Sequence, residues 1–207
     1  MVWKASAGSM TGASPAIAEG IVSDTAIATP QGWRPAASLM PGDEVLTFDN
    51  GVRPLVGSAF HTLLPDGAGH WPMCVPPWAL DNRDEVLLLP EQKVLIEADV
   101  AEELFGEAFV LVPAQALQGW RGIDRARPPQ GKAAVVLCFD EPQIIYASRG
   151  VLLSCPGEGL ASPDWHDPGH QSCTLSQARH LIACIMAEEA GAALLKARQH
   201  ASGTLAP

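Results

Sequence analysis

Two histidines in one loop-like stretch are the side chains best suited to hold a metal in this sequence. His166 and His170 lie within residues 164–173, together with two aspartates and a cysteine. Imidazole, carboxylate and thiolate groups are the ligands that zinc prefers. Proline and glycine between the two histidines prevent a single helical face, and the stretch holds no paired CxxC. We therefore expect a polar loop without a metal or cofactor, with a zinc-dependent hydrolase using His166 and His170 as an alternative.

Five cysteines are the other reactive side chains, and they are scattered along the chain. They are Cys74, Cys138, Cys155, Cys173 and Cys184. An odd number of widely spaced cysteines in a chain of 207 residues is typical of reduced thiols, which favours a cytoplasmic protein. Cys155 ends an apolar run, where a cysteine is more often a small buried residue than a nucleophile.

Charge and composition exclude two classes of partner. The chain has 23 acidic and 13 basic residues, a formal net charge of −10, and 47% hydrophobic residues. A nucleic-acid-binding protein shows a basic stripe, whereas the most basic stretch here, 121–127, also holds Asp124. No window approaches the roughly 20 apolar residues of a membrane span. We expect no nucleic-acid partner and no membrane span.

Short β-type runs alternate with turns through most of the chain. Residues 20–51 read as strand, turn, strand, turn, strand, with one strand expected over 21–29 and hairpin chemistry at 49–51. Residues 61–77 and 120–129 are proline-bearing and are expected to be loops. Further strands are expected at 52–57, either side of a break at 89–90, and at 109–113, 133–139, 143–147 and 151–155, with short helical segments at 97–105 and 114–117.

Proline, glycine and helical periodicity divide the rest. Residues 1–19 lack the apolar core of a secretory signal and are expected to be a flexible tail. Residues 156–173 are expected to be a linker rich in proline and glycine, and 199–207 a second tail.

One long helix is expected over 174–198, with Ser176 as its N-cap. Apolar residues recur along it at helical spacing, and such a stripe needs a partner surface. Either the β domain of this chain or another molecule supplies that surface. The stripe comprises Leu181, Ile182, Ile185, Met186, Ala190, Leu194 and Leu195.

The β pattern of residues 20–51 resembles the opening block of the Hint, or Hedgehog/intein, domain family. Residues 87–96 resemble the second block of that family and residues 146–155 its closing block, so the resemblance covers about 20–157. It implies a mainly β fold, a Hint-like folded-over β-barrel over 20–155, with the C-terminal α-helix added. The first block is carried by Asp24, Thr25, Ile27, Thr29, Gly32, Leu39, Pro41, Gly42, Asp43 and Val45.

The resemblance also implies a chemistry, an acyl shift in which a Cys or Ser attacks the preceding peptide carbonyl. The family's nucleophilic Cys aligns with Gly20, which has no side chain to attack with. The Thr-x-x-His motif of the second block aligns with residues 89–92, so Gln92 replaces the histidine, and a later histidine aligns with Gln143. An amide exchanges no proton near neutral pH.

From these three replacements we expect a non-splicing module, a pseudoenzyme whose pocket or C-terminal helix binds a peptide or another protein. The alternative is a self-cleaving protein that uses Ser23 or Cys155 as its nucleophile. Ser23 lies three residues after Gly20, so in a regular strand it would point to the opposite face. The candidate site therefore comprises Ser23, Gln92, Gln143 and Cys155.

Overall fold

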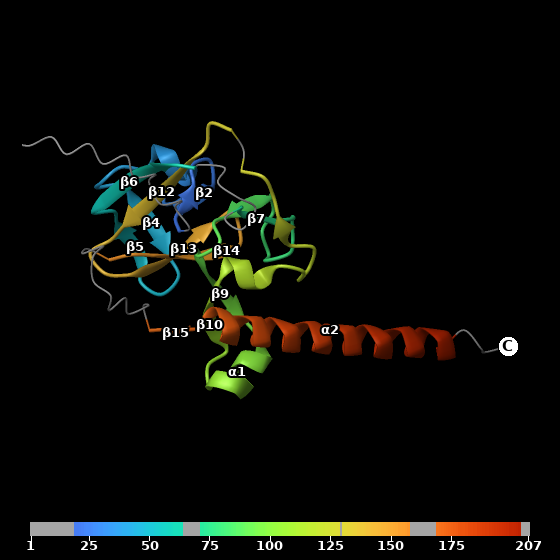
Figure 1. Cartoon of the computed structure of the whole chain (residues 1–207). Helices are drawn as coiled ribbons and strands as arrows, with labels where there is room; N and C mark the ends of the chain where they lie inside the picture. Colours follow the sequence, from blue (N-terminus) through green and yellow to red (C-terminus); the bar gives the residue numbers. More distant parts are fainter. Residues whose placement is uncertain (1–18, 64–70, 129, 158–168, 204–207) are drawn as a thin grey trace, which may run out of the picture.

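The computed structural model describes residues 19–63, 71–128, 130–157 and 169–203, which form a mainly β structure ended by a long helix (Figure 1). One sheet has six strands in the order β11-β7-β8-β1-β12-β6. The bounds of these strands, in that order, are Asp124–Arg125, Met73–Val75, Val86–Leu88, Ile21–Val22, Ala133–Cys138 and Gly57–Thr62.

The second sheet has nine strands. Seven follow the order β15-β10-β9-β14-β13-β2-β3, while β4 pairs with β13 and β5 with β4. All neighbours are antiparallel except β10 and β15. Their bounds are Gln171–Ser172, Phe109–Pro113, Lys93–Glu97, Val151–Cys155, Gln143–Ala147, Ala26–Thr29 and Gly32–Pro35, then Glu44–Thr47 for β4 and Gly51–Pro54 for β5.

The single strand expected over 21–29 is two strands, one in each sheet. β1 pairs with β12 and β8, whereas β2 pairs with β3 and β13. Between them the Thr25 backbone N–H donates to the Val22 carbonyl at 2.9 Å, which closes a turn. The chain thus leaves one sheet and enters the other, and this crossing places the start of β1 against β12.

Side chains from both sheets fill one apolar core. Alternation along β14 shows the arrangement: Leu153 and Cys155 join the core cluster, while Leu152 lies on the outer face with a smaller cluster. Phe139, directly after β12, is fully buried in the core. The predicted mainly β fold with a C-terminal helix is confirmed, although the strand pairing of the described residues gives two sheets and no closed barrel.

Short strands replace parts of the expected loops. β7 and β11 lie within the stretches 61–77 and 120–129 and pair with each other, with Asp124 opposite Cys74. β15, at the end of the stretch 156–173, pairs with β10. Each of these strands has two or three residues, and its hydrogen bonds go to segments far away in the sequence, so local pattern gave no signal for it. Most of the expected linker, 158–168, lies outside the described residues.

Within the described ranges, two α-helices and two 3₁₀ turns accompany the sheets. The short helix α1 spans Asp99–Phe105, and the 3₁₀ turns η1 and η3 span Ala36–Ser38 and Ala114–Leu117. The long helix α2 spans Leu175–Gly203 and so ends beyond Arg198. No helix among the described residues has the length and apolarity to cross a membrane.

The N-cap of α2 is Thr174 and not Ser176, so that prediction was wrong. The Thr174 hydroxyl accepts the backbone N–H of Gln177 at 3.3 Å, and the Gln177 side chain accepts the backbone N–H of Thr174 at 2.9 Å. This reciprocal pair is a capping box, which satisfies two donors instead of the one that Ser176 could serve.

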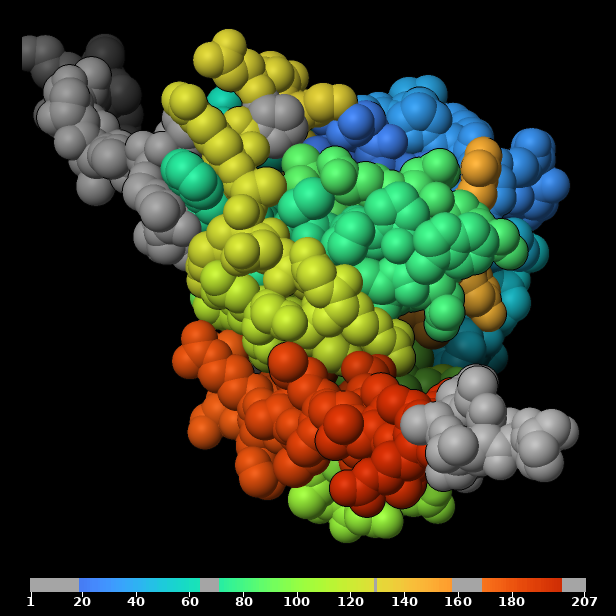
Figure 2. Space-filling view, turned by 90° about the vertical axis from the view of Figure 1, so that its right-hand side faces the viewer, coloured from blue at the N-terminus to red at the C-terminus, as the bar shows by residue number. Residues whose placement is uncertain are grey.

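The first half of α2 lies against the β domain and α1. In Figure 2 this part of the helix, orange to red, lies between α1 below and the yellow-green segment around η3 above. Glu189 marks the end of the contact, because its carboxylate accepts from the Trp120 indole at 3.1 Å and from the Arg121 guanidinium at 2.7 Å. Residues 190–198 are all exposed, and Figure 1 shows this half extending away from the body of the molecule.

Candidate functional site

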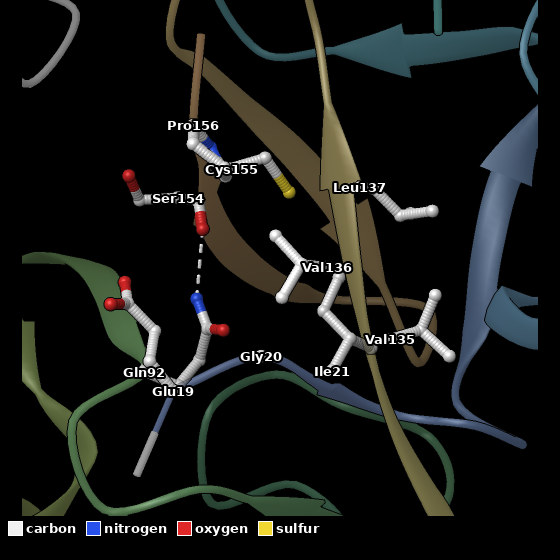
Figure 3. A pocket seen from close by; sticks show the side chains of 10 residues that line it. All are labelled: Glu19, Gly20, Ile21, Gln92, Val135, Val136, Leu137, Ser154, Cys155 and Pro156. Carbon is white, nitrogen blue, oxygen red and sulfur yellow. Dashed lines mark hydrogen bonds between the residues drawn. The ribbon is translucent and has the colours of Figure 1, made fainter. Parts of the chain in front are cut away.

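A cavity of about 90 Å³ opens where β1, β12 and β14 meet (Figure 3). Three segments supply its wall: residues 19–21 at the start of β1, 135–137 of β12, and 154–156 at the end of β14. Gln92, in the turn before β9, completes it. The crossing of the chain between the two sheets thus brings together three of the positions singled out from the sequence, namely Gly20, Gln92 and Cys155.

The backbone at Gly20 has a conformation that favours glycine. Its φ is +123°, a region that residues with a side chain rarely adopt. A Cβ added there would lie 3.4 Å from the Val135 carbonyl oxygen and 3.5 Å from the Val136 side chain. The backbone conformation at the position that aligns with the family's nucleophile therefore favours glycine, while a Cβ there would make only ordinary van der Waals contacts.

Gln92 is committed to the backbone of its neighbours. Its side chain is 2% exposed, and its Nε2 donates to the Ser154 carbonyl at 2.8 Å and to the Lys93 carbonyl at 3.1 Å. A carboxamide has two N–H donors, so both are used. In Figure 3 this amide reaches from the start of β9 toward β14, with the bond to Ser154 drawn as a dashed line. Gln92 therefore connects the start of β9 with β14, and its amide exchanges no proton for catalysis.

Cys155 is the one thiol in the wall of the cavity. Its side chain is 2% exposed and points toward Val136. Burial raises the pKa of the Cys155 thiol far above its ordinary value, and nearby Cys138 and Glu19 raise the pKa further. The nucleophilic form of cysteine is the thiolate, so around neutral pH this side chain is an uncharged, apolar part of the wall.

Gln143 lies beside Cys155 but outside the wall of the cavity. The two residues are cross-strand partners in the β13–β14 pair, so their side chains share a face. Gln143 is 1% exposed, and its Oε1 accepts from the Asn50 side chain at 2.9 Å. This bond connects the sheet to the β4–β5 hairpin. Gln143 therefore acts as a buried polar contact between two parts of the fold.

Ser23 does not contribute to the cavity. It lies in the turn after β1, where its backbone N–H donates to the Ala133 carbonyl at 2.9 Å and its carbonyl accepts from Ala37. Its hydroxyl accepts the Ala133 N–H at 3.4 Å. The predicted displacement of Ser23 away from the side of Gly20 arises because the chain turns into the second sheet at this point.

Leu89, which aligns with the family's threonine, is part of an apolar cluster. It is 1% exposed and packs with Val22 and Ala134. Threonine and leucine differ here in kind, because a hydroxyl can bond to an amide and an isobutyl group cannot. The position now contributes packing between β1, β12 and the turn before β9.

The two histidines of the alternative zinc site are not brought together by the described part of the structure. His170 pairs with Asp49, Nε2 to Oδ2 at 3.0 Å, and packs against the rings of Phe48 and Phe109. His166 lies outside the described residues. Within the described ranges, no group of three or more His, Cys, Asp or Glu side chains is placed to hold a metal ion.

Three contributors to the site were missed by sequence reasoning. The Ser154 carbonyl, which receives the Gln92 amide, is a backbone atom and has no side-chain signature. Residues 135–137 of β12 form most of the apolar wall, and their apolar run predicted a buried strand without indicating a cavity. Asn50, the partner of Gln143, was recognised only as part of a turn.

Comparisons with known proteins identify the family of this chain. Residues 20–152 match the family described as Hint domain, and no curated protein matches the chain. Among solved structures, a similar chain is described as the AceL NrdHF class 3 split intein, in a GSH-linked, splice-inactive variant. It shares 9% identity with this chain, covers 68% of it and 99% of itself, and has a TM-score of 0.40.

Proposed function

Because this chain belongs to the Hint domain family, we propose that it is a non-splicing Hint module whose cavity binds a small apolar group of a peptide or other ligand. The observation that carries the proposal is the backbone of Gly20. A φ of +123° at the position of the nucleophile favours glycine over cysteine or serine. The loss of chemistry is therefore built into the conformation as well as into the residue type.

The other two chemical positions support the same proposal. Gln92 and Gln143 are both buried amides whose hydrogen bonds connect separate parts of the fold. Acyl transfer needs groups that donate or accept a proton as the bond breaks. An amide that already donates to two carbonyls, as Gln92 does, stabilises the scaffold without that capacity.

The space that remains supports binding. Protein interiors are close-packed, and voids larger than a water molecule are few. The cavity of about 90 Å³ is several times the roughly 10–15 Å³ that one water molecule requires, so it has room for a small branched group. Ile21, Val136 and Leu137 make its wall mainly apolar, so a branched aliphatic side chain fits both the size and the polarity.

An NMR titration with isobutyramide tests the binding part of the proposal. This probe carries an isopropyl group bonded to an amide carbonyl, one carbon closer to it than the isopropyl group of a valine residue. We expect the methyl signals of Ile21, Val136 and Leu137 to shift at millimolar probe, while those of Leu104, an exposed residue of α1, stay fixed. The variant Val136→Phe, which fills the cavity, should remove the response. Fixed wall signals, or an unchanged response in Val136→Phe, would reject the cavity as a binding site.

Self-cleavage through Cys155 is the competing proposal, favoured over Ser23 by one observation. Cys155 shares the cavity wall with Gly20, and Ser23 does not. Iodoacetamide labelling of the folded protein over a pH series, read by peptide mass, distinguishes the cases. Burial holds the pKa of Cys155 high, so we expect no labelling of Cys155 at pH 7–9. Labelling with an apparent pKa at or below the free value of about 8.5 would favour a nucleophile.

A further inference from the structure

The two halves of α2 differ in what they contact. Ala178, Leu181, Ile182 and Ile185 are buried against the rest of the chain. Beyond Glu189 the helix continues with every residue from 190 to 198 exposed. An isolated helical segment is marginal in water when nothing packs against it. The projecting half therefore lacks the tertiary support that holds the first half.

This projecting half carries an apolar face of its own. Leu194 and Leu195 are 67% and 61% exposed. They lie three to eight residues after Ala187 and Gly191, so all four share one side of the helix. A Cβ at Gly191 would meet no atom within 4 Å, which shows how open this side is. We define the outer face as Ala187, Glu188, Gly191, Leu194, Leu195 and Arg198.

We propose that the outer face pairs with the outer face of a second copy of this chain, with the two α2 helices antiparallel and crossing near Gly191. Such a pairing is isologous, meaning that the same patch serves both copies, as in most protein dimers. It is independent of the proposed function of the cavity, because Gln92, Cys155 and β12 lie outside α2.

Side-chain size supports an antiparallel crossing at Gly191. In that arrangement Leu195 of one helix lies opposite Ala187 of the other, so a large side chain faces a small one on both sides of the centre, while Leu194 lies opposite Glu188. A glycine in the middle of a helix destabilises it relative to alanine. Its lack of a side chain allows two helices to approach closely, which gives Gly191 a role at the crossing.

The charges of the outer face are complementary to themselves. Glu188 precedes Gly191, and Arg198 follows it. Antiparallel pairing places Glu188 of one copy within one helical turn of Arg198 of the other, twice by symmetry. Glu188 has no ion pair with any described residue. A parallel pairing would instead place like charges together, so the charge order selects both the orientation and the identical partner.

The expected dimer is weak. Residues 187–203 form a helix of roughly 26 Å, and two crossed helices of that length bury less than the roughly 1,600 Å² of a standard interface. We expect a Kd in the micromolar range, with monomer and dimer exchanging as the concentration changes.

Sedimentation velocity of the full chain between roughly 1 and 200 µM, which brackets the expected range, tests the dimer. Wild-type protein should shift from monomer to dimer, and Leu194→Asp/Leu195→Asp should stay monomeric. Met40→Asp is the matched control, because Met40 is 66% exposed and lies in a turn of the β domain, so it should dimerise as wild type does. Wild-type protein that is monomeric throughout, or a double variant that dimerises normally, would overturn the proposal.

Two further variants separate the geometry from simple loss of helix. Gly191→Gln improves helix propensity but places a long polar side chain at the crossing, so helicity should rise while the dimer is lost. Glu188→Lys should weaken the dimer by about tenfold, because two symmetric pairs become repulsive, and adding Arg198→Glu should restore it. A Gly191→Gln protein that dimerises normally, or an unchanged Kd in Glu188→Lys, would contradict the antiparallel crossing.

Discussion

Two buried amide side chains, Asn82 and Gln92, hold two different regions of this protein together. Asn82 is completely buried, and it bonds to the Leu80 N–H and to the carbonyls of Val75, Pro76 and Asp84. Gln92, where the family's histidine would be, likewise bonds to backbone carbonyls. In both regions a buried amide satisfies backbone groups of neighbouring segments.

The regions differ in what surrounds the amide. The Asn82 loop lies directly against the β13–β14 turn: Asp81 has a φ of 58°, and its carbonyl leaves no room for a Cβ at Gly150, although a hollow of about 370 Å³ borders Leu80, Asp81 and Gly150 on another side. Gln92 instead borders an open cavity. The two regions therefore differ in the contact they make: in one the Asp81 backbone excludes any side chain at Gly150, and in the other the amide of Gln92 lines a mainly apolar cavity.

Gly150→Ala should have the largest effect, because it attacks the tighter region. A Cβ at Gly150 would overlap the Asp81 carbonyl, which is backbone and cannot swing aside. We expect a loss of about 3–5 kcal/mol of unfolding free energy, or failure to fold. Urea unfolding measures this, with Gly57→Ala as the control, since its Cβ would meet only Cys138 at 3.6 Å. Equal stabilities for the two variants would show that the loop is not tightly packed.

Asn82→Ala should come next. It leaves buried backbone groups of Leu80, Pro76 and Asp84 without their partner. We expect a loss of about 3 kcal/mol, equivalent to a fall of roughly 6–12 °C in Tm for a chain of this size. Differential scanning calorimetry measures the Tm, and a fall of less than roughly 2 °C would mean that the hydrogen bonds of Asn82 do not stabilise the fold.

Gln92→Ala should cost less than Asn82→Ala, because it frees fewer carbonyls and the cavity can admit water to them. We expect a loss of about 1–2 kcal/mol, read from the same calorimetry. A neutral variant would mean that the bond to the Ser154 carbonyl does not support the fold. A loss larger than that of Asn82→Ala would mean that the cavity region is the more tightly held one.

The smallest effect concerns the thiol of Cys155 and appears only at high pH. Burial raises the pKa of this thiol in the folded state, so folded and unfolded chains are both protonated below the unfolded value of about 8.5. As pH rises above that value, the unfolded chain releases the proton first, and stability falls. Cys74, whose pKa burial and Glu85 raise to about 11, adds to the slope between those values.

Between pH 8.5 and 10, the unfolding free energy of Cys155→Ala should fall by roughly 1 kcal/mol less than that of wild type. Urea unfolding at four pH values in this range measures it in both proteins. Parallel stability curves for wild type and Cys155→Ala would contradict a buried, neutral thiol in the cavity wall.

Local pattern was enough for the long elements of this fold. The runs 109–113, 143–147 and 151–155 are strands with the predicted bounds, because turn residues flank apolar stretches there. β7, β11 and β15 were not predicted, since their two or three residues form strands only through distant partners. The sheet change after Val22 is likewise a property of tertiary pairing.

The candidate site also combines features that the sequence indicated with features that it did not. The family resemblance singled out Gly20, Gln92 and Gln143 as the positions that align with reactive residues, and the structure brings Gly20 and Gln92 to one cavity. The positive φ of Gly20 and the Ser154 carbonyl that Gln92 contacts are backbone properties, which residue types do not encode one by one. The N-cap of α2 is Thr174 instead of the expected Ser176, because Thr174 and Gln177 each accept the backbone N–H of the other with their side chain.

If this chain performs no acyl shift, the peptide bond before Gly20 stays intact. An intact-mass time course of the full-length chain measures this. Purified protein would be incubated with and without added thiol, beside the variant Cys155→Ala. We expect one unchanged mass with and without thiol, in wild type and in Cys155→Ala alike. Release of residues 1–19, accelerated by thiol and absent from Cys155→Ala, would show that an acyl shift still operates in this cavity.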